Sequence, residues 1–283
     1  MIASLFARHR IVAAFLAAIF VLTLAAGSAS AQSTSDSTTD ATHPQSAPTS
    51  TTDTQQPSAA SWPPPWGPPV HDNGILYYAN FNELETRLTG AYPTFRWDSE
   101  GYIGDANNKF WVKSEGSLTN GVMSDGDQEF LYDRPIPRVR YFDFQVGVRA
   151  DLDAGPTRTW GAIGIQGMAP YFFDFEPTLY IRGDGHVAGR IEGSYNLFIT
   201  QHLILQPQAE LNFYSKDDLA RGIGSGLSDI DTGVRIGYQI TRKFAPYVGF
   251  TYASGFGNTA NLARQAGAPT HDSSFVVGIW VWR

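Results

Sequence analysis

Long stretches of this chain alternate apolar and polar residues with a period of two. Within residues 142–151, the apolar side chains fall on one face and the polar side chains on the other. Successive side chains of a β-strand point to opposite faces of a sheet, so this alternation predicts a strand. It recurs in twelve segments with no helical stretch between them: 75–89, 93–104, 108–119, 125–134, 139–151, 158–168, 171–183, 186–199, 202–215, 227–240, 244–254 and 274–283. The sequence therefore predicts an all-β fold.

Three features of these segments favour a transmembrane antiparallel up-and-down β-barrel of the bacterial outer-membrane type. The segments reach the roughly 9–11 residues that a tilted strand needs to cross a bilayer. Their polar face is dense in Asp, Glu, Arg and Gln, which is typical of a narrow barrel interior, and aromatic residues gather near the segment ends. A soluble β-sandwich, which alternates in the same way but packs its apolar face inside, is the competing interpretation.

The connections between the segments support the barrel independently. Counted along the chain, the even-numbered connections are short, such as 135–138 and 169–170, whereas the two longest, 216–226 and 254–273, are odd-numbered. Short periplasmic turns and longer outer loops are typical of outer-membrane barrels. We therefore expect a barrel domain over 71–283 that begins and ends on the periplasmic side.

The region before the barrel is predicted to have two parts. Residues 1–31 combine Arg8 and Arg10, an apolar run over 11–26 and small residues over 29–31, as in a cleaved secretory signal peptide. A transmembrane anchor is the alternative for this run. Residues 32–70 are rich in Ser, Thr, Pro and Gln and are predicted to form a disordered tail, because they have little apolar surface to bury. The expected location is the bacterial outer membrane.

Charge and cysteine content exclude several classes of protein. The chain carries a formal charge of −7, and without residues 1–31 it keeps 18 basic and 27 acidic residues. Nucleic-acid partners need clustered Lys and Arg, so we expect none. The absence of cysteine excludes a disulfide-stapled fold, a cysteine zinc site and a thiol nucleophile.

A set of motifs follows in a fixed order along the predicted barrel. They are Leu84-Glu-Thr-Arg87, Trp97-Asp-Ser-Glu-Gly-Tyr-Ile-Gly104, Phe110-Trp-Val-Lys-Ser-Glu-Gly116, Pro170-Tyr-Phe-Phe173, Leu205-Gln-Pro-Gln-Ala-Glu-Leu-Asn212, Lys216-Asp-Asp218, Arg221-Gly-Ile-Gly-Ser-Gly-Leu-Ser-Asp229 and Phe244-Ala-Pro-Tyr-Val-Gly249. This set resembles the outer-membrane copper resistance protein B family over nearly all of 71–283. The resemblance implies an outer-membrane β-barrel that binds or passes copper and works with periplasmic copper-handling proteins.

The chain departs from that family's usual pattern in its copper ligands. Members usually carry a Met/His-rich region before the barrel, whereas residues 32–70 offer only His43. Beyond the initiator, the methionines are Met123, expected in an outer loop, and Met168. The chain also ends in Arg283 rather than in the usual phenylalanine. Thioether and imidazole groups favour copper, so the side chains suited to it are few.

Two places in the predicted barrel could supply such metal ligands. His71 and Asp72 open the first strand near the periplasmic mouth, and Met168 falls at a periplasmic turn with the same parity as the inward-facing Gln166. His186 belongs to an inward-facing set near the outer rim. The alternative interpretation is that His71 is solvated and that Met168 fills a gap in the packing.

The polar faces together would bring many charges into one narrow lumen. The acids are Glu83, Glu85, Asp98, Glu100, Glu115, Asp143, Asp174, Glu176, Glu192, Glu210, Asp229 and Asp231. The bases are Arg87, Lys113, Arg149, Arg182, Arg190 and Arg235. Enclosed charges must pair or bind ions. One interpretation is a structural ladder of ion pairs, and the other is an acid-lined route that attracts cations. Since acids outnumber bases, some carboxylates must be protonated, hydrated or ion-bound.

These observations leave three hypotheses for function. The first is a non-enzymatic barrel that binds copper or moves it across the outer membrane, with copper as the suspected ligand. It would contact outer-membrane lipid, meet periplasmic copper-handling proteins and act as a monomer. The second is a structural or passive barrel without metal specificity. The third is an outer-membrane lipid hydrolase, for which 271–273 (His-Asp-Ser), expected in a loop, has suitable residue types, although a triad is a geometric object.

Overall fold

The computed structural model describes residues 74–89, 92–139, 141–153 and 156–282. The predicted signal peptide and tail lie outside the described residues, as do His71 and Asp72. No helix within the described ranges is long and apolar enough to cross a membrane.

The described residues form a succession of long β-strands and one helix. The strands are β1 (Leu76–Leu88), β2 (Thr94–Gly104), β3 (Lys109–Thr119), β4 (Val122–Pro135), β5 (Phe142–Asp151), β6 (Arg158–Ala169), β7 (Phe173–Ile181), β8 (Val187–Tyr195), β9 (Leu197–Phe198), β10 (Leu203–Tyr214), β11 (Gly226–Tyr238), β12 (Phe244–Gly255) and β13 (His271–Trp282). The helix, α2 (Gly257–Gln265), lies between the last two strands.

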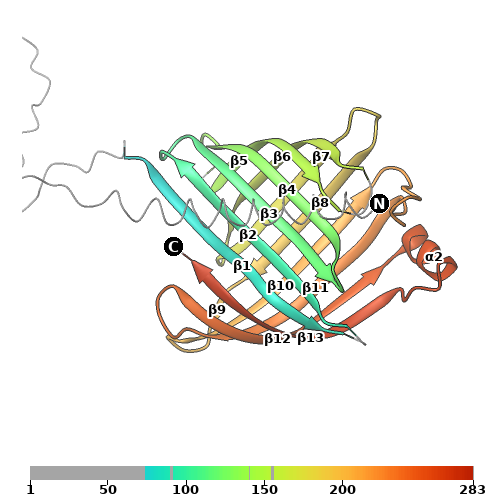
Figure 1. Ribbon diagram of the computed structural model, residues 1–283. Helices are drawn as coiled ribbons and strands as arrows, with labels where there is room; N and C mark the ends of the chain where they lie inside the picture. The colour runs from blue at the N-terminus through green and yellow to red at the C-terminus, as the bar shows by residue number, and fades with distance from the viewer. Residues whose placement is uncertain (1–73, 90–91, 140, 154–155, 283) are drawn as a thin grey trace, which may run out of the picture.

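The sheet closes on itself, so it is a barrel. Strands that follow one another in the sequence pair antiparallel, and β13 pairs with β1 to complete the circle. The two-residue β9 continues the line of β8, because both pair with β10. The wall therefore has twelve strand positions, which confirms the predicted fold, and Figure 1 shows these strands running at a slant around the barrel.

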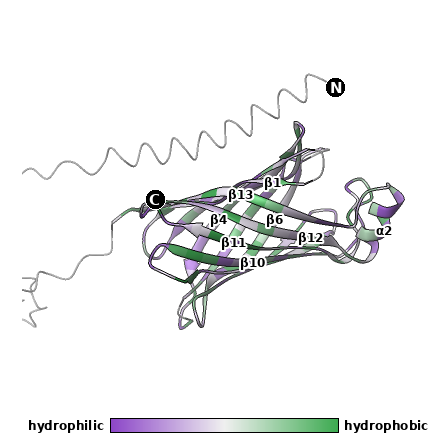
Figure 2. Ribbon diagram, turned by 90° about the horizontal axis from the view of Figure 1, so that it is seen from below, coloured by the Kyte–Doolittle hydropathy of each residue, from purple (hydrophilic) through white to green (hydrophobic). Residues whose placement is uncertain are grey.

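The alternation in the sequence separates the two faces of this wall. On β5, the outward-facing Val148 is 54% exposed, whereas its neighbour Arg149 points inward and is 8% exposed. Hydrophobic and hydrophilic stretches accordingly alternate along the strands in Figure 2. An apolar outer face suits hydrocarbon, and a polar inner face suits an enclosed lumen.

The two ends of the barrel differ in their connections. One end carries the start of β1, the end of β13 and turns such as 105–108 and 170–172, and we call it the short-turn end. The opposite end, the long-loop end, carries 215–225 and 256–270, with α2 in the second of these (Figure 1). Short turns typically face the periplasm in outer-membrane barrels.

The long-loop end corrects three expectations from the sequence. α2 lies where only loop was expected, and it is held by side-chain hydrogen bonds to the β10–β11 connection rather than by a long apolar face. His271 begins β13 instead of lying in a loop, because its pairing with Ser254 extends the ladder beyond the last apolar residue. Met123 belongs to β4 and pairs with Leu118 of β3.

A divided and charge-lined lumen as the candidate functional site

The structure places all the predicted inward-facing acids on the inner wall, where they border a cavity or contact an arginine: Glu83, Glu85, Asp98, Glu100, Glu115, Asp143, Asp174, Glu176, Glu192, Glu210, Asp229 and Asp231. It adds Asp127, Glu129 and Asp133 on β4, and the bases Arg96 and Lys109. The sequence analysis missed these five, although they keep the alternation of their own strands.

Strand register aligns many of these acids into two rows of like charge. We call them carboxylate row A and carboxylate row B. Row A crosses β1 to β5 as directly opposed residues, namely Glu83, Asp98, Glu115, Asp127 and Asp151. Row B crosses β7, β8, β10 and β11, namely Glu176, Glu192, Glu210 and Asp231. Like charges directly opposite one another destabilise a sheet, so the rows need cations from elsewhere.

A third row shows a different arrangement on the wall that carries row A. Across β2 to β5 the opposed residues alternate in sign, as Glu100, Lys113, Glu129 and Arg149. Lys113 also forms an ion pair with Glu176 of row B, and Arg149 lies over the ring of Tyr180 at 4.6 Å. This row needs no further charge from across the lumen.

Three arginines connect row A to row B. Arg87 on β1 contacts Glu83 of row A at 3.7 Å and Asp231 of row B at 2.6 Å. Arg96 on β2 contacts Glu83 at 3.0 Å, Glu115, and Glu210 on the opposite wall at 3.5 Å. Arg190 on β8 contacts Glu115 at 2.7 Å, Asp127 at 2.6 Å and Glu210 at 3.4 Å. Charge-assisted contacts of this kind join walls that no backbone hydrogen bond joins.

Buried side chains fill part of the lumen next to the wall formed by β11, β12, β13 and β1. Arg235, which is 1% exposed, donates to both carboxylate oxygens of Glu85 at 2.8 and 3.0 Å and pairs with Glu83 at 2.7 Å. Tyr247 donates its hydroxyl to Glu85 at 2.9 Å and stacks on Trp280 at a centroid distance of 4.6 Å. Arg235, Glu85 and Tyr247 thus satisfy one another as in a structural core, whereas the buried indole N–H of Trp280 has no hydrogen-bond partner among the described residues.

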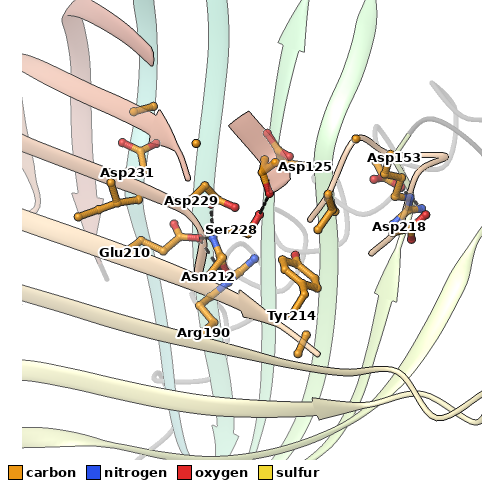
Figure 3. A pocket seen from close by; sticks show the side chains of 18 of the residues that line it. Asp125, Asp153, Arg190, Glu210, Asn212, Tyr214, Asp218, Ser228, Asp229 and Asp231 are labelled. Carbon is orange, nitrogen blue, oxygen red and sulfur yellow. Dashed lines mark hydrogen bonds and ion pairs between the residues drawn. The ribbon is translucent and has the colours of Figure 1, made fainter. Parts of the chain in front are cut away.

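The described residues line two large cavities inside the barrel. The long-loop chamber has a volume of about 410 Å³ and is shown in Figure 3, where Arg190, Glu210, Asn212, Asp229 and Asp231 lie close together. The short-turn chamber has a volume of about 600 Å³. Only four residues border both chambers, namely Glu115, Asp127, Tyr180 and Arg190. These four therefore lie between the two chambers.

Of the predicted metal ligands the structure describes Met168 and His186, and these two border different chambers. Met168 borders the short-turn chamber, is 42% exposed and pairs with Asp174, whereas its proposed companions His71 and Asp72 lie outside the described residues. His186 borders the other chamber, and its ring Nδ1 lies 2.9 Å from Asp184. The hydrogen bonds that Asp184 accepts from Arg182 and from the backbone of His186 lower the pKa of Asp184 in this exposed loop.

A different group has the compactness of a metal site. Oxygen atoms of Glu115, Glu192 and Glu210 all lie within 4.8 Å of one another. Arg190 contacts all three and Arg96 contacts Glu115 and Glu210, so this cluster is partly compensated within the protein. Sequence spacing could not reveal the cluster, because its members come from three strands on two walls.

The hydrolase hypothesis requires a serine hydroxyl in contact with a histidine ring. The ring of His271 stacks on Tyr252 at 6.4 Å, and that of His186 lies next to Asp184. Ser274 donates to Asp272 at 3.1 Å. Within the described part of the chain, neither of these histidine rings is hydrogen-bonded to a serine.

A closed antiparallel barrel with an apolar exterior and a charged interior defines an outer-membrane β-barrel protein. The family model described as "Copper resistance protein B precursor (CopB)" matches residues 75–282. The chain belongs to the copper resistance protein B family.

Curated relatives agree with this family. Copper resistance protein B of Escherichia coli is 36% identical over 216 residues, which cover 76% of this chain and 72% of the relative. Copper resistance protein B homolog of Pseudomonas syringae pv. tomato is 38% identical over 216 residues, covering 76% and 73%.

Solved structures of outer-membrane barrels are more distant. The NanC porin shares 14% identity with a TM-score of 0.47, covering 73% of this chain and 99% of the porin. A loop-deletion mutant of OmpT, an outer membrane protein of Vibrio cholerae, shares 6% identity with a TM-score of 0.32, covering 75% and 100%.

Proposed function

We propose that this barrel binds copper ions in its lumen and passes them across the outer membrane, without catalysing a covalent reaction. The observation that carries the proposal is the excess of acids in the short-turn chamber of a copper resistance family member. Asp98, Glu100 and Asp174 border this chamber and form no salt bridge among the described residues. Carboxylates left open to a cavity attract cations and repel anions.

The ligand chemistry favours Cu²⁺ over Cu⁺ as the ion carried. Oxygen donors dominate the short-turn chamber, and Met168 is its single thioether. Soft ligands select Cu⁺, whereas among divalent first-row ions a given site generally binds Cu²⁺ most tightly. We include in the proposal that the chain is exported with a cleaved signal peptide, acts as a monomer surrounded by lipid, and exchanges copper with periplasmic proteins.

Two measurements test this function. Purified, refolded barrel should bind Cu²⁺ more tightly than Zn²⁺ or Ca²⁺ in calorimetry, and deletion of the gene should lower copper tolerance. Met168→Leu should leave Cu²⁺ binding within twofold, because its thioether is not the main ligand. Equal binding of all three ions together with unchanged copper tolerance would instead indicate a passive barrel without metal specificity.

A further inference from the structure

The contacts that Arg96 and Arg190 make between carboxylate rows A and B lie where the two chambers meet. The four residues shared by the two chambers occupy the level at which Arg190 reaches from β8 to β3 and β4. Arg190 is 9% exposed, and its three guanidinium nitrogens all have acidic partners. It is therefore held across the lumen rather than lying along one wall.

Arg96 joins the same contacts from the opposite wall. It contacts Glu115, which also binds Arg190, and reaches Glu210, which Arg190 contacts as well. The two arginines thus share Glu115 and Glu210 and form one connected ion-pair lattice. A cation that crosses the barrel must pass this lattice, whose arginines oppose it, after leaving a chamber whose acids attract it.

We propose that Arg190, supported by Arg96, is the gating residue that separates the two chambers and limits ion flow through the barrel. This inference rests on the proposed function, because a closure matters only in a barrel that passes ions. The proposed gate would limit the passage of any small cation through the lumen, not of copper alone. A gate at this level would keep two chambers of about 410 and 600 Å³ from forming one open passage for other small solutes.

The first test is the conductance of the full, folded barrel in planar bilayers with KCl and no copper. Arg190→Gln removes the contacts that cross the lumen, so conductance should rise at least threefold over wild type. Arg87→Gln is the matched control, because Arg87 also joins row A to row B, through Glu83 and Asp231, but borders neither chamber. The control should keep conductance within 1.5-fold of wild type.

Arg96→Gln tests the same closure from the other wall if Arg190→Gln does not fold. Heat-modifiable migration on gels reports folding of each variant. We expect Arg96→Gln to raise conductance by less than Arg190→Gln, since Arg190 still spans the lumen. Unchanged conductance in every folded variant of Arg190 and Arg96, or an equal rise in Arg87→Gln, would overturn the proposed gate.

The gate and the copper function fail in different ways. Conductance in KCl reports the closure whether or not copper binds. If Arg190→Gln opens the barrel but the wild type binds Cu²⁺ no better than Ca²⁺, the gate stands and the copper function falls. If Cu²⁺ binds selectively while Arg190→Gln and Arg96→Gln both conduct like the wild type, copper binding stands and the gate falls.

Discussion

The two chambers of the lumen hold the same number of acids but very different numbers of bases. Ten Asp and Glu residues border each chamber, together with six Lys and Arg residues in the long-loop chamber and two in the short-turn chamber. Lys109 adds one further base to the short-turn half, where it pairs with Asp133 and Asp143. The acids of the long-loop half are therefore largely compensated by basic side chains of the protein. The short-turn half keeps an excess of negative charge.

This difference shows that an inward-facing charge can have two purposes in one barrel. In the long-loop half, Arg149 of β5 and Arg221 of the 215–225 loop both contact Asp151, so these charges hold the loop against the barrel wall. In the short-turn half, Asp98, Glu100 and Asp174 face open volume. Stability should depend on the first group, and ion binding on the second.

The largest expected effect is the loss of a base from the long-loop half. Arg149→Met removes contacts of 2.7 Å to Asp127 and 2.8 Å to Asp151. Removing one partner of a buried pair leaves uncompensated charge, so the free energy of unfolding should fall by about 3–5 kcal/mol. Urea unfolding in lipid vesicles measures this change.

Arg134→Met is the control for that measurement, because Arg134 is exposed at the end of β4. Its effect should stay within about 0.5 kcal/mol, as for most surface substitutions. If Arg149→Met lowered the free energy of unfolding by no more than this control, water would be replacing the lost ion pairs. The charges of the long-loop chamber would then not be needed for stability.

The next effect concerns ion binding in the short-turn half. The double variant Glu100→Gln and Asp174→Asn removes two carboxylates that form no salt bridge among the described residues, although Glu100 lies opposite Lys113. One unit-charge contact at 4 Å is worth about 1 kcal/mol even in water, and a divalent ion feels twice that. Cu²⁺ affinity should therefore fall at least tenfold in calorimetry, because tenfold corresponds to about 1.4 kcal/mol.

The matched double variant neutralises two acids of the long-loop chamber, Asp125→Asn and Asp229→Asn. Asp229 already accepts a hydrogen bond from Asn212 at 2.9 Å, so its loss should weaken Cu²⁺ binding less than threefold. Equal losses in the two double variants would show that the whole lumen, rather than one chamber, provides the binding charge.

A smaller effect of opposite sign is expected inside row B. Glu192 lies directly between Glu176 and Glu210 and touches a base only at 3.5 Å, through Arg190. Opposed like charges destabilise a sheet, and cross-strand pairs are worth about 0.2–1 kcal/mol. Glu192→Gln should therefore raise the free energy of unfolding by an amount in this range.

Glu129→Gln is the corresponding change in the row of alternating sign. Glu129 lies between Lys113 and Arg149 and accepts a hydrogen bond from the hydroxyl of Tyr180 at 2.6 Å. Its neutralisation should lower the free energy of unfolding. A loss of stability in Glu192→Gln as large as that in Glu129→Gln would show that row B is as well compensated as the alternating row.

The periodicity of the sequence was enough to predict the wall of this barrel. Alternation identifies strands and their faces because successive side chains point to opposite sides of the sheet. The strand β5 and the inward position of Glu192 therefore follow from neighbouring residues alone. Register does not follow in this way. That Glu115 lies opposite both Asp98 and Asp127 depends on pairing across hairpins, and the approach of Arg96 to Glu210 depends on closure of the whole barrel.

The division of the lumen was beyond sequence reasoning for the same reason. Sequence analysis gave an excess of acids but not its distribution between chambers, because a carboxylate and its arginine can be 114 positions apart, as Glu210 and Arg96 are. α2 was missed because its nine residues are held by polar contacts with another loop. A search for apolar periodicity does not detect such an element.

The smallest expected effect is at the rim of the long-loop chamber, where Asp217 holds α2. Its carboxylate accepts the backbone N–H of Ser225 at 2.6 Å and the side-chain amide of Asn258 at 2.9 Å, and these hydrogen bonds lower the pKa of Asp217. A lowered pKa in the folded state means that the contact is fully stabilising above the ordinary carboxyl pKa of about 3.9 and is lost as the pH falls through the lowered value. The protection factor of the Gly224 amide, which donates to Thr259 of α2, should therefore fall in acid in the wild type. In Asp217→Asn this protection factor should already be lower at neutral pH and show no acid transition, while copper binding in the short-turn chamber stays unchanged. A change in copper affinity in this variant would show that the rim of the long-loop chamber is coupled to the short-turn chamber, so that the two halves are not independent.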